Sequence, residues 1–245
     1  MISMDSVSSS INSLKVERKE LKYYISHNEY VILSNLLRKV LQQDKHNKDS
    51  KKSYHVRSLY FDTLDNESFE DKMAGIEERT KYRLRIYGTN AKWVKFEIKS
   101  KFNNSVLKET AIISKEDAAE IQNTNYEVML KYNNPFLNKA YQEFKKRPYR
   151  PVVMTDYFRE AFMYDLNKIR IVFDKFLKST SLQLDIFNKD PFPTQKLKRG
   201  IVIMEIKYNN FIPGFLKQIL QIPSFERSAI SKYCIGRLDY FESIV

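Results

Sequence analysis

Lysine and arginine recur at every second position in several short segments of this sequence. The segment "TKYRLRIYG" places Lys81, Arg83 and Arg85 two residues apart, with apolar residues between them. Residues two apart lie on one face of a β-strand, so this strand would have one cationic face and one apolar face. Like charges on one face repel each other, and binding of an anion relieves that repulsion.

The same alternation occurs in other segments. The charged residues in phase are Arg18, Glu20 and Lys22 in "VERKELKYY", Lys95, Glu97, Lys99 and Lys101 in "VKFEIKSK", Arg159 in "DYFRE", Arg170 in "KIRIVFD", and Glu205 and Lys207 in "IVIMEIKY". A sheet with one face in water also alternates polar and apolar residues, but solvent faces usually mix both signs of charge. Several cationic faces therefore favour a polyanion, or anions together with a metal ion, as the ligand.

The sequence lacks the usual loops and triads of phosphate and acyl chemistry. It has five glycines and no Walker A or GxGxxG pattern, so we expect side chains to bind phosphate. Cys234 is the single cysteine, which excludes an internal disulfide and a cysteine-based zinc site. The carboxylates of Glu20, Glu97 and Glu205 could hold Mg²⁺ or Mn²⁺, since hard cations take oxygen ligands. Phosphoryl transfer needs mainly positioning and charge neutralisation, so no protein nucleophile is required.

Composition and charge agree with an anionic ligand. The 245 residues carry a formal net charge of +12, from 42 Lys and Arg against 30 Asp and Glu, and 42% are hydrophobic. This indicates a folded chain whose partners are nucleic acid, phosphorylated molecules or an acidic membrane surface. The start "MISMDSVSSSINSL" has no signal-peptide pattern, and no apolar run approaches a membrane span. We expect a cytoplasmic protein.

The predicted elements are mostly strands. The strands are 16–24, 54–63, 79–87, 93–101, 106–114, 151–158, 169–173, 181–186 and 201–208, and the helices are 26–43, 114–122, 125–147 with a break at Pro135, 214–221 and 228–241. Few βα alternations indicate an antiparallel α+β fold. Closing the sheet would put the charged faces inside, so we predict an antiparallel β-barrel tunnel with surrounding helices. Residues 1–13 read as a disordered tail and 14–245 as a single domain.

Eight segments, in this order, resemble the VTC domain. They are "ERKELKYYI", "VRSLYFDT", "RTKYRLRIYG", "FEIKSK", "SVLKE", "DYFREAF", "VIMEIKY" and "SAISKYCIGR", and the resemblance covers about residues 16–241. This is the polyphosphate polymerase domain of the vacuolar transporter chaperone complex, which also occurs as stand-alone bacterial proteins. It belongs to the triphosphate tunnel metalloenzymes, which are related to CYTH domains. The resemblance implies that the γ-phosphate of ATP is transferred to a growing polyphosphate chain with Mn²⁺ or Mg²⁺ as cofactor.

The resemblance also implies a role for each matching residue. The implied catalytic residues are Arg83, Arg85, Lys99, Arg159 and Lys232; the implied substrate-binding residues are Lys22, Lys108, Tyr157, Arg170 and Ser231; and the implied metal ligand is Glu205. The alternating charge pattern adds Arg18 and Lys207 as candidate substrate-binding residues and Glu20 and Glu97 as candidate metal ligands. One departure is Arg18, which stands where the wider superfamily has the first glutamate of an ExExK motif. The chain therefore has fewer carboxylates to hold metal ions, which argues against catalysis with two metal ions.

Several alternatives remain open from the sequence. A hydrolase of triphosphate or polyphosphate would use the same architecture, and a non-catalytic polyphosphate-binding module would need no metal ligand. Glu20 and Glu97 could orient the arginines instead of binding metal, and Ser231 could be an ordinary helix residue. Nucleic acid is not the expected partner, because it would require an external basic patch with exposed stacking aromatics. A membrane or accessory partner stays undefined.

Overall fold

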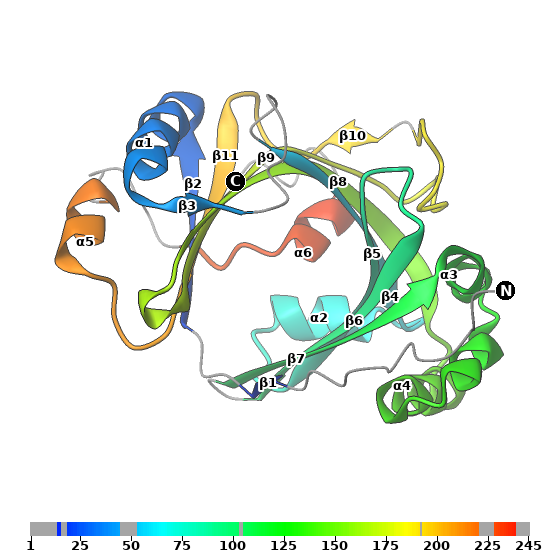
Figure 1. The fold of residues 1–245 in the computed structure, drawn as a ribbon. Coiled ribbons are helices and arrows are strands. Elements are labelled where there is room, and N and C mark those ends of the chain that lie inside the picture. The colour runs from blue at the N-terminus through cyan, green and yellow to red at the C-terminus, as the bar shows by residue number, and fades with distance from the viewer. Residues whose placement is uncertain are drawn as a thin grey trace, which may run out of the picture. The chain divides into compact units, whose positions relative to one another are not determined.

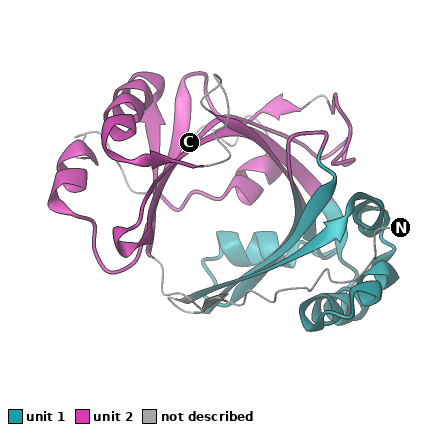
Figure 2. Cartoon of the chain, viewed as in Figure 1, with its two compact units in different colours: residues 1–16, 60–85, 91–151 teal, residues 17–59, 86–90, 152–245 magenta. Residues whose placement is uncertain are grey.

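The computed structural model describes residues 14–15, 19–44, 53–102, 105–191, 193–220 and 228–238. The predicted tail, residues 1–13, and the candidate Arg18 lie outside these residues. The chain forms two compact units (Figure 2): unit 1 consists of residues 1–16, 60–85 and 91–151, and unit 2 of residues 17–59, 86–90 and 152–245. The single domain expected for 14–245 stays a prediction.

The elements make an α+β fold, as predicted (Figure 1). The strands are β1 (Leu14–Lys15), β2 (Lys19–Ser26), β3 (Gln42–Gln43), β4 (Tyr54–Asp62), β5 (Arg79–Tyr87), β6 (Trp93–Phe102), β7 (Ser105–Ser114), β8 (Arg150–Tyr164), β9 (Ile169–Thr180), β10 (Thr194–Gln195) and β11 (Ile201–Tyr208). The helices are α1 (His27–Val40), α2 (Glu67–Met73), α3 (Lys115–Gln122), η1 (Tyr126–Tyr132), α4 (Pro135–Lys146), η2 (Leu166–Lys168), α5 (Gly214–Leu220) and α6 (Lys232–Arg237).

The strand pairs whose register is defined are antiparallel. The strand order is β1-β7-β6-β5-β4-β8-β9-β11-β2, with β10 on β9 and β3 on β8. Among the described residues this order is open, with β1 and β2 as its two end strands. The antiparallel α+β class is therefore confirmed, while hydrogen bonds between described strands do not by themselves complete a closed barrel.

The core of unit 1 is an aromatic cluster under the apolar face of β5 and β6. Phe144 of α4 stacks on Tyr149 with ring centroids 4.5 Å apart and meets Tyr82 edge to face at 4.9 Å. Phe96 of β6 approaches the same Phe144 ring at 6.1 Å. These side chains are buried, and such ring pairs add to the stabilisation by burial itself. The apolar side of the alternating pattern thus faces the helices, as the sequence predicts.

The predicted helix break at Pro135 is confirmed. A 3₁₀ helix, η1, precedes it, and α4 begins at Pro135, where the missing N–H group costs no hydrogen bond. The side chain of Asn134 caps α4 by accepting a hydrogen bond from the Phe136 amide at 2.9 Å. These local signals place α4 over the aromatic cluster.

The core of unit 2 lies between its sheet and two helices (Figure 1). Its buried residues come from α1 and α5 on one side and from β2, β8, β9 and β11 on the other: Ile25, Tyr30, Leu33, Leu37, Leu41, Phe162, Ile169, Ile171, Phe173, Val202, Met204, Ile206, Leu216 and Leu220. Helix α1 begins with a capping box, in which Ser26 accepts from the Glu29 amide and Glu29 accepts from the Ser26 amide.

Some predicted element boundaries are wrong. Residues 181–186 are not a strand, because the Thr180 hydroxyl accepts hydrogen bonds from the Leu182 and Gln183 amides and turns the chain. Residues 228–231 are not helical, and α6 begins only at Lys232. Helix α2 was not predicted. Asp62 is the last residue of β4, and its carboxylate accepts a hydrogen bond from the Ser68 amide in the first turn of this helix.

A buried glutamate joins α1 to β8 in unit 2. Glu160 is fully buried and accepts hydrogen bonds from Tyr30 at 2.8 Å, Ser34 at 3.0 Å and Arg38 at 2.8 Å. Because Tyr30→Phe removes one donor from a buried carboxylate, we expect the free energy of unfolding to fall by about 1–3 kcal/mol. Urea denaturation measures this change. The matched variant Tyr24→Phe alters a partly exposed tyrosine, and an equal loss there would contradict the assignment.

Candidate functional site

The first cationic face belongs to unit 1. The register pairs Arg83 with Glu97 across β5 and β6, and Lys99 with Lys108 across β6 and β7. Arg85 lies two residues beyond Arg83 on β5 and so shares this face. The structure therefore brings these five predicted site residues to one face of one sheet, opposite the aromatic core.

Glu97 is the centre of this face. It is buried, with Arg83 Nε at 2.7 Å, Lys108 Nζ at 2.5 Å and Arg85 Nη1 at 3.5 Å from its carboxylate oxygens. Burial alone would raise the pKa of Glu97, but the three cations hold that pKa well below its ordinary value. The Tyr60 hydroxyl accepts a further hydrogen bond from Arg83 at 3.1 Å. This arrangement favours an orienting role for Glu97 over the alternative role as a metal ligand.

Lys108 should give this face a dependence on pH. Burial lowers the pKa of Lys108 to about 8, although Glu97 opposes the shift. Its ammonium charge is therefore lost as the pH rises through this value, so we expect affinity for inorganic triphosphate to fall between about pH 7 and about pH 9. Calorimetric titration across this range measures the fall. Lys108→Arg keeps its charge and should remove the fall; an unchanged fall would assign it to another group.

The second charged face belongs to unit 2 and combines both signs of charge. The register of β2 and β11 pairs Lys22 with Glu205 and Glu20 with Lys207. Lys207 also lies opposite Arg170 of β9. Opposite charges thus alternate along β2 and β11 and between these two strands, which offsets the repulsion between Lys207 and Arg170. These five residues were all predicted to share one side of the sheet, and the register places them there.

Two carboxylates on this face are paired with lysines of their own strands. Glu205 lies 2.7 Å from Lys207 Nζ, and Glu20 lies 2.9 Å from Lys22 Nζ. Lys22 also donates a hydrogen bond to the Ile230 carbonyl at 3.0 Å. Burial opposes ionisation of Glu205, but Lys207 and Lys22 hold its pKa well below the ordinary value. Glu205 is therefore a buried, ionised oxygen donor.

Asp174 is a charged residue of this face that the sequence reasoning missed. It is fully buried and receives two hydrogen bonds from Arg159, at 2.6 and 2.7 Å, and an ion pair from Lys232 at 2.6 Å. Burial raises the pKa of Asp174, but Arg159 and Lys232 lower it more, so the carboxylate is ionised. The alternation in the sequence could have identified Asp174, because it lies in phase with Arg170 on the same strand and so shares its face.

Tyr157 lies beneath the two cations that Asp174 holds. Its side chain is buried, with Arg159 at 5.4 Å and Lys232 at 5.2 Å from the ring centroid. These distances fit cation–π contacts, so the Tyr157 ring stabilises the positive charges of Arg159 and Lys232. Ser231 accepts a hydrogen bond from the Cys234 amide and caps α6. A direct contact of Tyr157 or Ser231 with substrate stays a prediction.

Helix α6 brings Lys232 to this face by close packing. A side chain at Gly236 would meet Val153 at 3.1 Å, Thr155 at 3.2 Å and Ser179 at 3.3 Å. The Ser179 hydroxyl donates a hydrogen bond to the Gly236 carbonyl at 3.1 Å. Glycine therefore lets α6 approach β8 and β9 closely, which sets Lys232 beside Asp174. Cys234 of this helix is buried.

Arg170 lies on β9 and is held by partners from elsewhere in unit 2. It forms an ion pair with Asp44 and donates a hydrogen bond to the Tyr54 hydroxyl at 3.1 Å. Asp44 is buried and was not singled out from the sequence, because it lies in a charged segment that reads as a solvated loop. Arg170 is thus oriented by a carboxylate, as Arg83 and Arg159 are.

The carboxylates can be compared with the needs of a divalent cation. The described residues contain no group of three or more His, Cys, Asp or Glu side chains that could hold a metal ion by themselves. Mg²⁺ commonly takes one or two carboxylates, with substrate phosphates and water as further ligands. Ionised Glu205, with Glu20 on the neighbouring strand, fits a cation shared with phosphate better than a cage made only of protein.

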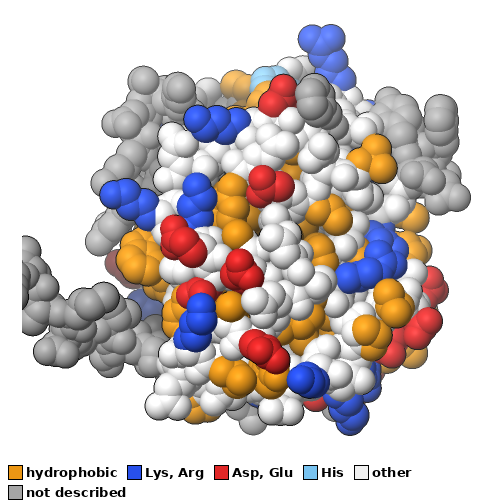
Figure 3. All heavy atoms as spheres, turned by 90° about the vertical axis from the view of Figure 1, so that its right-hand side faces the viewer, with side chains coloured by type: hydrophobic (Ala, Val, Ile, Leu, Met, Phe, Trp, Pro, Cys, Tyr) orange, Lys and Arg blue, Asp and Glu red, His pale blue; other side chains and the backbone are white. Residues whose placement is uncertain are grey.

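The charges visible on one outer face are mixed. Figure 3 shows Lys and Arg side chains interspersed with Asp and Glu on this face, with no area of a single sign.

In the described residues, no helix combines the length and hydropathy that a membrane crossing needs.

Fold and site together define an antiparallel α+β protein with clustered, carboxylate-held cations on its sheet. Among solved structures, HpAC1 of Hippeastrum, described as a candidate adenylyl cyclase with a dominant triphosphatase activity, is 15% identical over 89% of this chain and 94% of its own, with a TM-score of 0.51. It shows similarity of fold alone. Proteins described as candidate adenylate cyclases from Bacillus halodurans (13% identical, 84% of this chain and 88% of that one, TM-score 0.43) and Vibrio parahaemolyticus (13%, 90% and 98%, 0.46) are more distant in structure.

The VTC domain matches residues 17–241 of the sequence. The chain therefore belongs to the VTC domain family, and the resemblance found from its charged motifs is confirmed. A search of curated proteins gives no match.

Proposed function

We propose that the protein is a metal-dependent polyphosphate polymerase that transfers the γ-phosphate of ATP to the end of a polyphosphate chain. The observation that carries this proposal is that Arg83, Arg159 and Arg170 are each held by a carboxylate on a sheet face of a VTC domain. Arginines fixed in this way lose little side-chain freedom when phosphate binds, so more of the binding energy is kept.

The proposed chemistry needs no protein nucleophile. A terminal oxygen of polyphosphate forms a bond to the γ-phosphorus of ATP, and the bond from that phosphorus to the bridging oxygen breaks, releasing ADP. On the face of unit 1, Arg83, Arg85 and Lys99 supply positive charge that neutralises phosphate, and on the face of unit 2 Arg159 and Lys232 do the same. Further phosphate contacts on each face come from Lys108 in unit 1 and from Lys22, Arg170 and Lys207 in unit 2.

A divalent cation, Mn²⁺ or Mg²⁺, would be held by Glu205 with Glu20 and by the phosphate oxygens of the substrate. When bound, it withdraws charge from the transferred phosphate and so supports the bond change. Lys207 and Lys22 hold the pKa of Glu205 low, so this carboxylate is ionised before a cation arrives, and Glu20 forms an ion pair with Lys22.

One incubation tests this function. The purified chain is mixed with ATP and Mn²⁺, and ADP, free phosphate and polymer are followed separately. Polymer that accumulates with ADP and with little free phosphate supports the polymerase. Free phosphate without polymer would overturn it in favour of hydrolysis, and the absence of all three products would overturn both enzymatic functions.

A second candidate function is hydrolysis of triphosphate or polyphosphate. It is favoured by the described triphosphatase activity of HpAC1, whose fold is similar. Water would replace the polyphosphate terminus as the attacking group, with the same charged residues around the phosphorus. The carboxylate set, with Arg18 in place of a glutamate, favours the polymerase over this alternative.

A further inference from the structure

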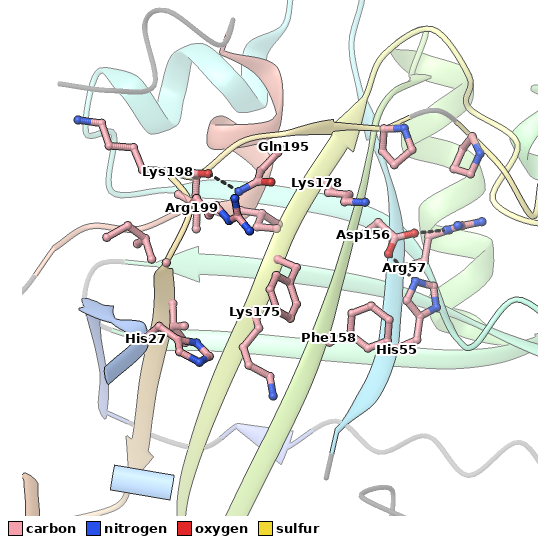
Figure 4. A pocket seen from close by; sticks show the side chains of 18 of the residues that line it. His27, His55, Arg57, Asp156, Phe158, Lys175, Lys178, Gln195, Lys198 and Arg199 are labelled. Atoms are coloured by element: carbon pink, nitrogen blue, oxygen red, sulfur yellow. Dashed lines mark hydrogen bonds and ion pairs between the residues drawn. The ribbon is translucent and has the colours of Figure 1, made fainter. Parts of the chain in front are cut away.

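Unit 2 contains a pocket outside the charged faces. Its volume is about 750 Å³, and it is formed by residues of β8 and β9, the turn at 88–89 and the segments 189–191 and 193–202 (Figure 4). Phe158, which lines it, is the neighbour of Arg159 on β8, and adjacent residues of a strand point to opposite faces. The pocket therefore lies on the other side of the strand from Arg159. None of the proposed phosphate-binding residues is among the described residues that line it.

A β-bulge in β9 shapes this pocket. Asp156 pairs with Lys178 and Phe158 with Lys175, so one extra residue lies on β9 between these pairs. Phe176 has a φ of +56°, which is a rare conformation for an aromatic residue. The bulge leaves Phe176 exposed at the pocket, which the half-exposed Phe158 also lines. Bulges often redirect side chains at binding sites, and an exposed pair of phenylalanines at a hollow indicates an apolar or aromatic group in the ligand.

The base of the pocket is fixed by an ion-pair cluster. Asp156 receives a hydrogen bond from Arg57 Nε at 2.7 Å and contacts His55 through its other oxygen. Arg57 also donates to the Ile186 carbonyl at 3.2 Å. The His55 ring packs 5.4 Å from the Phe158 ring, measured between centroids. Each of these groups is engaged within the protein, so the cluster holds the aromatic wall in place.

Several exposed cations also line the pocket. Lys178 and Arg199 line it, and Figure 4 shows both side chains at the same end of the pocket, above Phe158 in this view. Neither forms an ion pair within the part of the chain that the structure describes. An aromatic wall beside cations that lack a counter-ion suits a ligand with a planar ring and a phosphate chain, because rings stack on aromatic side chains and phosphates attract Arg and Lys.

We propose that this pocket is a second nucleotide-binding site, which takes a nucleoside di- or triphosphate with its base against Phe158 and Phe176 and its phosphates at Lys178 and Arg199. The site is separate from the proposed catalytic residues. A nucleotide bound here would report the supply of ATP or ADP to the protein without taking part in phosphate transfer.

Binding is tested in the full chain carrying Arg83→Ala and Arg159→Ala, which remove one arginine from each charged face and so reduce the contribution of those faces to the signal. ATP and inorganic triphosphate each compete, without metal, against a fluorescent N-methylanthraniloyl ATP followed by anisotropy. We expect Phe158→Ala to weaken ATP binding about tenfold and to leave triphosphate binding unchanged. Lys178→Ala with Arg199→Ala should weaken both ligands about tenfold or more.

The control is Lys217→Ala, which removes an exposed lysine of α5 in the same unit and should change binding less than about twofold. Circular dichroism of each variant shows whether it is folded. The proposal is overturned if the background chain binds no ATP, or if folded pocket variants bind ATP as the background chain does. Equal loss of ATP and triphosphate binding in Phe158→Ala would overturn the placement of the base.

Discussion

Glu205→Gln is expected to abolish phosphate transfer while the protein stays folded. Glutamine has nearly the same shape, but it removes the buried negative charge that Lys207 and Lys22 keep ionised. A neutral amide is a poor ligand for Mg²⁺ or Mn²⁺ when a carboxylate is lost, and the loss of one preorganised electrostatic group slows turnover by on the order of 10³-fold. The rate of ADP formation from ATP, with polymer measured in parallel, gives the effect.

Glu205→Asp is the control for this change. It keeps the charge on a shorter side chain, so part of the activity should remain and should rise with the metal concentration. Near-normal turnover in a folded Glu205→Gln variant would refute the role of Glu205 as a metal ligand. Equal losses in both variants, with no response to metal, would assign Glu205 to holding Lys207 and Lys22 in place.

Arg83→Ala should have an effect of similar size in unit 1. Arg83 is aligned by Glu97 at 2.7 Å and by the Tyr60 hydroxyl at 3.1 Å, so its guanidinium is fixed before a ligand binds. Removing an arginine that neutralises a transferred phosphate costs on the order of 10³-fold in rate. Steady-state kinetics with ATP and a short polyphosphate primer measure the loss, which should fall mainly on kcat.

The matched control is Arg147→Ala in the same unit. Arg147 pairs with Glu67 at 2.6 Å, but both side chains are about half exposed and lie outside the charged face. Such a surface pair contributes about 0–1 kcal/mol, so both stability and turnover should change little. If both arginine variants lost activity equally, the effect would come from net charge and not from the position of Arg83.

The regularity of the charged strands explains why their faces could be predicted. Side chains alternate in any strand, so Arg83 and Arg85, or Glu205 and Lys207, must share a face once their segment is extended. The apolar residues between them identify the covered side. The first residues of two helices could also be predicted from nearby sequence, as with Ser26 at α1 and Ser114 at α3. A capping side chain forms its hydrogen bond within the first turn of its own helix.

Other features depended on contacts between distant segments. The pairing of Asp174 with both Arg159 and Lys232 required the register of β8 and β9 and the close packing of α6 at Gly236. The carboxylate of Glu97 could have bound metal or oriented arginines, and only the three cations around it favour the second role. Tertiary packing determines such partners, and the periodicity of the sequence does not show which distant residues will meet.

The sequence by itself determined which residues face the same way, that the fold is antiparallel α+β, and that the chain resembles a VTC domain, because these follow from short-range alternation and from motif order. The tertiary structure decided which carboxylate holds which cation, where the bulge exposes Phe176, and how the pocket on the other side of β8 from Arg159 forms. Those features arise where segments far apart in the chain meet, and the free energy of such contacts is a property of the packed arrangement and not of any one segment.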